Sequence, residues 1–122
     1  MSTLLIQTPE LADGEVYLGG RISKIGEVQH SILIAINDAE LSLDGQREWA
    51  KSKGGVLMNR HEALVIYNEH RDIVKPDWYW TDEECEWNSA YAWYQNFDGG
   101  GQRHNRKSAA LRAVAVRRLS IQ

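Results

Sequence analysis

The segment from Ala92 to Gln102, which reads AWYQNFDGGGQ, contains the signals that decide the fold. In its first half the polar Gln95 stands among large aromatic residues, and aromatic residues favour the pleated surface of a sheet. This pattern predicts a half-buried strand over residues 91–97. Asp98 and the three glycines after it predict a turn, because glycine adopts backbone conformations that other residues avoid. The segment is therefore expected to be a strand followed by a reversal of the chain.

Aromatic residues are concentrated around this strand. Eight of them lie within residues 78–97: Trp78, Tyr79, Trp80, Trp87, Tyr91, Trp93, Tyr94 and Phe97. Successive side chains of a strand point to opposite faces of the sheet, so a single face cannot hold all these rings. We expect Trp93, Tyr94 and Phe97 to contribute to the core and some of the other rings to form an aromatic surface.

Strand signals dominate both ends of the chain. Apolar and β-branched residues predict strands over Glu15–Leu18, Ser31–Ile36, Trp78–Thr81 and Leu111–Leu119. A further short apolar segment begins at Leu4–Ile6. Glycine and proline residues separate these segments, as is typical of turns and loops.

Two short helices are expected between these groups of strands. The first spans about residues 44–53 and ends where Gly54 begins a glycine pair. The second spans about residues 60–72: Asn59 is its N-cap, and Glu62 stands at the position that completes a capping box. Strands, two helices and strands again predict an α+β fold with antiparallel sheets.

The composition indicates one globular domain covering residues 1–122. Its longest apolar stretch, Ile32–Ile36, is much shorter than the ~20 residues of a membrane-spanning helix or the core of a signal peptide. We therefore expect neither a membrane span nor a signal peptide. The single cysteine, Cys85, excludes an internal disulfide and a multi-cysteine zinc site.

The net charge of −3 conceals two oppositely charged parts. Residues 1–98 contain 8 Lys and Arg against 17 Asp and Glu, whereas residues 99–122 contain 6 Lys and Arg and no acidic residue. A basic segment can bind phosphates, but it can also pair with acidic groups of the same chain, such as those in residues 82–86. Intramolecular pairing is the simpler expectation.

Parts of the C-terminal half resemble the DUF1566 family and its phage and prophage relatives. The similar segments are Tyr79–Glu84, Ala92–Gln102, Lys107–Ser108 and Arg112–Arg118. That family is similar to the variable domains of diversity-generating retroelement target proteins, which have the C-type lectin fold and are distantly similar to formylglycine-generating enzymes. Upstream, Asn59–Leu64 resembles the two-helix part of the relatives, although Met58 and Asn59 stand where they usually have Pro-Thr.

The resemblance implies a C-type-lectin-like fold, in which terminal strands pair, two helices flank their sheet and a second small sheet of hairpins completes the domain. Leu4–Ile6 or Glu15–Leu18 would then pair near Ala113–Leu119, and residues 78–107 would form the hairpins. In the relatives these hairpins are the ligand face. The implied ligand-binding residues are Trp87, Asn88, Tyr91, Gln95, Asn96, Arg103, His104, Asn105 and Arg106.

Motifs for catalysis and cofactor binding are incomplete. Residues 101–108 come close to a phosphate-binding loop, but Arg106 replaces its second glycine. His61 begins a zinc-helix pattern, but Val65 replaces the second histidine. The chain also lacks the proline-containing calcium motifs of sugar-binding lectins, and Cys85 alone cannot reproduce the paired cysteines of formylglycine-generating enzymes. We therefore expect no catalytic residue, no metal and no cofactor.

Together with the incomplete motifs, the resemblance implies a non-enzymatic, metal-independent binding module of phage or prophage type, acting in the host cytoplasm or on the virion. Its 78–107 hairpins would recognise an unidentified protein or glycan. One alternative is an oligomeric, virion-associated structural or receptor-binding component, in which the basic strand end of one subunit meets the acidic residues 82–86 of the next. Another is nucleic-acid binding through the basic segment 103–118, which the overall acidity disfavours. An enzyme remains an alternative if the fold brings together catalytic residues that are distant in the sequence.

Overall fold

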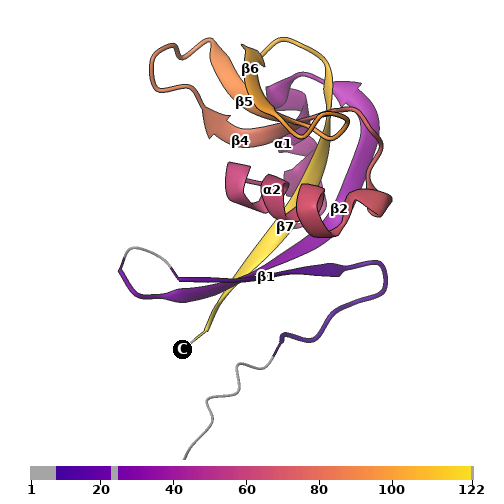
Figure 1. Cartoon of the computed structure of the whole chain (residues 1–122), viewed down its shortest axis with the longest axis vertical. Helices are drawn as coiled ribbons and strands as arrows, with labels where there is room; N and C mark the ends of the chain where they lie inside the picture. The colour runs from indigo at the N-terminus through magenta and orange to yellow at the C-terminus, as the bar shows by residue number, and fades with distance from the viewer. Residues whose placement is uncertain (1–7, 23–24, 122) are drawn as a thin grey trace, which may run out of the picture.

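The computed structural model describes residues 8–22 and 25–121, so the apolar segment at Leu4–Ile6 lies outside the described residues. Two long antiparallel strands, β2 (Val28–Leu41) and β7 (Leu111–Ile121), form the centre of the fold (Figure 1). Both are rich in the apolar and β-branched residues that favour strands. The strands predicted around Ser31–Ile36 and Leu111–Leu119 are confirmed, and both extend further than expected.

The described residues form one seven-stranded sheet around this pair. β1 (Val16–Ile22) lies outside β2, whereas β4 (Trp78–Glu84), β5 (Tyr91–Asn96) and β6 (Gln102–Arg106) follow on the other side of β7. A short strand that the sequence did not predict, β3 (Val56–Leu57), also pairs with β7. The α+β class is confirmed.

Two features of the sheet differ from those expected. Of the two segments expected to pair near Ala113–Leu119, Leu4–Ile6 lies outside the described residues. The other, Glu15–Leu18, does not pair there, because β1 and β2 form a local hairpin and β2 occupies the place beside β7. The strands are also not all antiparallel, since Tyr79 and Trp80 of β4 pair in parallel with Arg112 and Ala113 of β7. After β6 the chain crosses back over β5 and β4 and enters β7 in the direction of β4. The hairpins therefore continue the main sheet and do not form a separate one.

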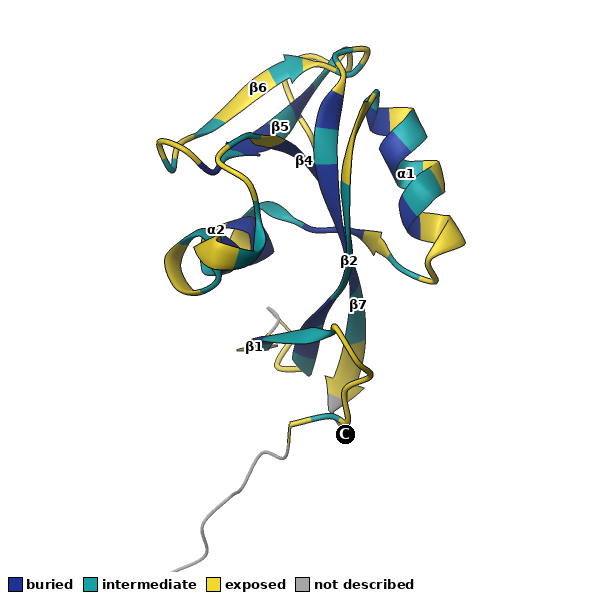
Figure 2. Ribbon diagram, turned by 90° about the vertical axis from the view of Figure 1, so that its right-hand side faces the viewer, coloured by how far each residue is buried: buried dark blue, intermediate teal, exposed yellow. Residues whose placement is uncertain are grey.

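The two predicted helices are confirmed as α1 (Leu43–Ser52) and α2 (Arg60–Glu69), and Figure 2 shows them on opposite faces of the central strands. The capping box of α2 is present: Asn59 Oδ1 accepts from the Glu62 N–H, and Glu62 Oε1 accepts from the Asn59 N–H, each at 2.8 Å. The helix ends before the expected residue 72, because the chain tightens into the 3₁₀ turn η1 (Arg71–Ile73).

The core has two layers, one on each face of the sheet. β7 supplies both: Val114 and Val116 pack in the layer that α2 covers, and Ala113 and Ala115 pack in the layer that α1 covers. Successive side chains of a strand alternate between faces, so a strand covered on both faces is apolar without interruption. This arrangement leaves β4, β5 and β6 as an extension of a rigid centre.

Candidate binding face

The register of β5 and β6 divides the predicted ligand-binding residues between two faces of the sheet. Trp93 lies opposite His104, and Tyr91 lies opposite Arg106. Opposed residues share a face, as do residues two apart on one strand, so these four side chains lie on the same face. The other face receives Asn96, Arg103 and Asn105. The predicted residues therefore do not form one continuous site.

Four of the side chains on the first face, Trp87, Tyr91, Trp93 and His104, form what we call the aromatic cluster. The His104 ring meets the other three nearly edge-on, with its centroid 4.7 Å from that of Trp87, 5.7 Å from Tyr91 and 5.9 Å from Trp93. Trp87 comes from the loop between β4 and β5, and 60% of its surface is exposed. Aromatic side chains that remain in contact with solvent are typical of binding surfaces.

Arg60, in the first turn of α2, lies against the aromatic cluster. Its guanidinium carbon is 3.8 Å from the centroid of the Trp93 ring, a cation–π contact. Sequence reasoning missed Arg60 because it belongs to a distant element and no local pattern connects it with Trp93. It also assigned Trp93 to the core with Tyr94 and Phe97. Tyr94 and Phe97 are buried, but Trp93 is only half-buried.

Gln95, predicted to bind a ligand, is fully buried. Its Nε2 donates to the carbonyl oxygens of Asn96 at 3.1 Å and Gly100 at 3.0 Å, and its Oε1 accepts from Gln102 Nε2 at 3.0 Å. These bonds hold the glycine turn between β5 and β6. Since the amide group already has partners and no exposed surface, Gln95 supports the site and does not contact a ligand.

The three predicted asparagines orient the backbone with their side-chain oxygens. Asn88 Oδ1 accepts from the N–H two residues later at 3.0 Å, and Asn96 Oδ1 does the same at 2.9 Å. Asn105 Oδ1 accepts from the N–H of the next residue at 2.8 Å. Such bonds stabilise turns and irregular strands, and they leave mainly the amide NH₂ groups for a partner.

The basic C-terminal segment is largely neutralised within the chain. Lys107 pairs with Glu84, Arg112 with Asp38 and Asp77, Arg117 with Glu15, and Arg118 with Glu62. Of these four basic residues, Lys107 alone has its ion-pair partner in the acidic run at 82–86. Arg103 and Arg106 are exposed, and within the described ranges neither forms an ion pair.

Two open hollows adjoin the aromatic cluster. One, of about 570 Å³, is lined by Tyr91 and Arg106 together with neighbouring loop residues. The other, of about 440 Å³, lies on the Arg60 side, between the start of α2 and the strands β1, β4 and β6. The Tyr91 side and the Arg60 side of the cluster therefore each adjoin an open hollow.

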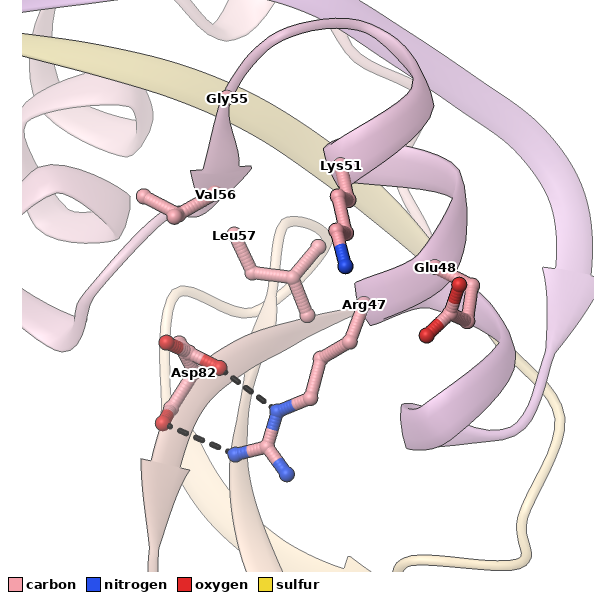
Figure 3. Close-up of a pocket in the computed structure, with 7 residues that line it drawn as sticks. All are labelled: Arg47, Glu48, Lys51, Gly55, Val56, Leu57 and Asp82. Carbon is pink, nitrogen blue, oxygen red and sulfur yellow. Dashed lines mark hydrogen bonds and ion pairs between the residues drawn. The ribbon is translucent and has the colours of Figure 1, made fainter.

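A third hollow, of about 360 Å³, lies beside α1, at β3 and β4 (Figure 3). Arg47 reaches across it and donates from Nε to Asp82 Oδ1 at 2.7 Å and from Nη2 to the Asp82 carbonyl oxygen at 3.3 Å. Because Arg47 and Asp82 already pair with each other, this hollow is a weaker candidate for a binding site than the hollows beside the aromatic cluster.

Cys85 lies close to Arg60 but has a buried thiol. Burial raises the pKa of the Cys85 thiol, against the smaller lowering effect of the Arg60 and Lys107 charges. A thiol with a raised pKa is a poor nucleophile. Among residues 8–22 and 25–121, no three His, Cys, Asp or Glu side chains are grouped to hold a metal ion. No helix in the same ranges is long and apolar enough to cross a membrane.

Comparison with known proteins gives no family for the chain: it matches no protein-family model, and no curated protein is significantly similar to it. The candidate site therefore depends on the geometry of the chain itself. That geometry identifies the aromatic cluster, with Arg60 and Arg106 at its borders, as the surface best suited to binding.

Proposed function

We propose that the protein is a non-enzymatic, metal-independent binding module of phage or prophage type with a C-type-lectin-like fold. It recognises a protein or glycan through the hairpin region 78–107, and the aromatic cluster is the centre of the contact. The aromatic cluster is the observation that carries the proposal, because the His104 ring contacts the other three rings and Trp87 remains 60% exposed.

The arrangement of the elements supports the proposed fold. β2, from the N-terminal half, pairs with the final strand β7, and two helices lie on opposite faces of this pair. The hairpins β4, β5 and β6 are inserted between α2 and β7 in the chain and extend from the sheet. A rigid centre with inserted hairpins suits recognition, because binding loses less conformational entropy when the contact residues are already ordered.

The proposal is tested by removing one exposed tryptophan and one arginine without an ion pair from the aromatic-cluster face. The Trp87→Ala/Arg106→Ala double variant should bind its partner at least about tenfold more weakly, because aromatic and arginine side chains supply most of the energy at binding hot spots. Purified wild-type and variant proteins would be compared by capture of host-cell proteins and by glycan-array binding. Circular dichroism and thermal unfolding would verify that the variant folds.

The other face of the hairpin offers a matched control. Trp78 is 43% exposed and stacks on Tyr94, and Arg103 lies on the same face as Tyr94. The Trp78→Ala/Arg103→Ala variant therefore also loses one tryptophan and one arginine without an ion pair, but it keeps the aromatic cluster. This control variant should still bind the partner. If both variants still bind the partner, or if only the control variant fails to bind it, the assignment of the aromatic-cluster face is wrong.

The two alternatives gain less support from the described contacts. An oligomer joined through the acidic run 82–86 would compete with existing pairs, since Asp82 pairs with Arg47 and Glu84 with both Arg47 and Lys107. Nucleic-acid binding through 103–118 would depend mainly on Arg103 and Arg106, because the other basic side chains of this segment are paired. Two exposed arginines neutralise few phosphates.

A further inference from the structure

The Arg60 guanidinium is held in position, yet most of its hydrogen-bonding capacity is unused. Its Nε donates to Gln102 Oε1 at 2.8 Å, and its carbon lies 3.8 Å from the Trp93 ring centroid. Within the described part of the chain, no acceptor is bonded to its two Nη groups. The guanidinium therefore presents free N–H donors at a defined place, with the aromatic cluster directly beside it.

The support for Arg60 extends into the core. Gln102 Nε2 donates to the Arg60 carbonyl oxygen at 2.8 Å and to Gln95 Oε1 at 3.0 Å, so the residue that fixes Arg60 is itself fixed at both ends. Gln95 in turn is fully buried. Because the guanidinium is already ordered, a ligand that binds it loses little side-chain entropy.

The hollow that Arg60 lines contains two arginines and one carboxylate. Arg21 of β1 and His61 of α2 line it as well, and Glu83 is the single carboxylate among its lining residues. Glu83 Oε2 accepts from the Arg60 backbone N–H at 2.7 Å, so this carboxylate bonds the start of α2 and not the guanidinium. The arrangement favours an anion at the Nη groups.

We propose that Arg60 is the receptor for a carboxylate of a protein partner, whose acidic residue lies next to an apolar residue that contacts the aromatic cluster. This inference rests on the proposed function and specifies the partner's chemistry. The planar guanidinium matches a carboxylate with two parallel hydrogen bonds. The cluster beside it supplies the apolar half of the contact.

The geometry favours a peptide over a sugar as the source of the carboxylate. Three rings of the cluster meet His104 at 84–89°, which makes a ridged surface and not a flat platform for a sugar ring. Side-chain amides that would bond sugar hydroxyls are also scarce on this face: Gln95 is buried, and Asn96 and Asn105 lie on the other face of the sheet. Asn88 uses its Oδ1 to bond the backbone.

The test uses two peptides that differ in one charge, acetyl-Phe-Glu-Phe-amide and acetyl-Phe-Gln-Phe-amide. Each is titrated into ¹⁵N-labelled full-length protein while NMR follows the Nε–H signal of Arg60 and the indole signals of Trp87 and Trp93. The Glu peptide should shift all three signals and bind roughly tenfold more tightly, as expected for one charge-assisted pair. Rising salt should reduce the difference between the peptides.

Variants of two stacked arginines separate the role of Arg60 from general charge. Arg60→Gln should bind both peptides equally, and Arg60→Lys should restore only part of the preference, because an ammonium lacks the planar pair of donors. Arg71 is the matched control: its guanidinium lies 4.3 Å from the Tyr67 ring, beyond the opposite end of α2, and Arg71→Gln should keep the full preference.

Equal binding of the two peptides by the wild type would overturn the proposal that Arg60 binds a carboxylate. Indole shifts with both peptides would still leave the aromatic cluster as the binding face, so the two proposals fail separately. If neither peptide shifts any of the three NMR signals, the proposal that Arg60 binds an acidic peptide is also overturned. Glucuronate is added as a third probe, and stronger binding of this acidic sugar than of the Glu peptide would contradict the choice of a protein partner.

Discussion

Glu62 lies in the first turn of α2, and only 1% of its surface is exposed. Its carboxylate accepts hydrogen bonds from Arg118 Nε at 2.9 Å and Arg118 Nη2 at 2.7 Å, in addition to the backbone bond of the capping box. Burial by itself raises the pKa of Glu62, but hydrogen bonds from Arg118, Ser31 and Asn59 together lower the pKa below its ordinary value. The ionised carboxylate therefore joins α2 to β7.

The lowered pKa makes stability dependent on pH. A carboxylate whose pKa is lower in the folded than in the unfolded state stabilises the fold above its unfolded pKa of ~4.3. That contribution is lost as the pH falls through the folded pKa. Glu62→Gln should lower the free energy of unfolding by about 3 kcal/mol at neutral pH, because Arg118 loses its buried partner. The difference in the free energy of unfolding between the wild type and this variant should become smaller as the solution is acidified.

Urea unfolding at a series of pH values measures this difference, and Glu69→Gln at the exposed end of the same helix is the control. A difference between wild type and Glu62→Gln that stays constant down to pH values below the ordinary carboxylate range would show that the Glu62 charge is not responsible.

At the scale of elements, the turn between β5 and β6 packs directly against α2. Gly100 in this turn has φ +84°, and a Cβ placed on it would lie 2.5 Å from Tyr67 Cζ. Gly54, after α1, has nearly the same backbone conformation, φ +82°, but a Cβ there would meet no atom within 4 Å. The two glycines therefore differ in the space around them and not in backbone strain.

Alanine substitution should separate these two effects. Gly54→Ala should lower the free energy of unfolding by about 1 kcal/mol, which is the cost of a left-handed conformation in a residue with a side chain. Gly100→Ala should lower the free energy of unfolding by ~1–3 kcal/mol more than Gly54→Ala does. The reason is that the new methyl group displaces the Tyr67 ring and loosens the contact between the turn and α2. Chemical denaturation measures both values. Equal losses would mean that the turn does not depend on close contact with α2.

At the scale of the whole molecule, the middle of β7 is covered on both faces, whereas β1 and β6 are the edges of the sheet. Native-state hydrogen exchange should therefore be slowest for amides in β7 between Ala113 and Val116, whose opening approaches global unfolding. Hydrogen-bonded amides of β6 should exchange much faster, because an edge strand can open locally. Protection of β6 equal to that of β7 would contradict the expectation that the edge of the sheet opens before its centre.

Local patterns in the sequence determined most of the elements. The N-cap Asn59 with Glu62 predicted the start of α2, and the glycines after Asp98 predicted the turn that follows β5. The burial of Tyr94 and Phe97 also followed from the strand pattern. These signals succeed because caps, turns and strand alternation depend on residues only a few positions apart.

Only the tertiary structure decided which elements lie together. It placed β2 and not β1 beside β7, made the β4–β7 pair parallel, and brought Arg60 against Trp93. Contacts between distant segments depend on how the whole chain closes its loops and fills both core layers, and no short pattern records that balance. For the same reason the sequence predicted aromatic and polar ligand residues in one hairpin, but the pleat of the sheet separated them and buried Gln95.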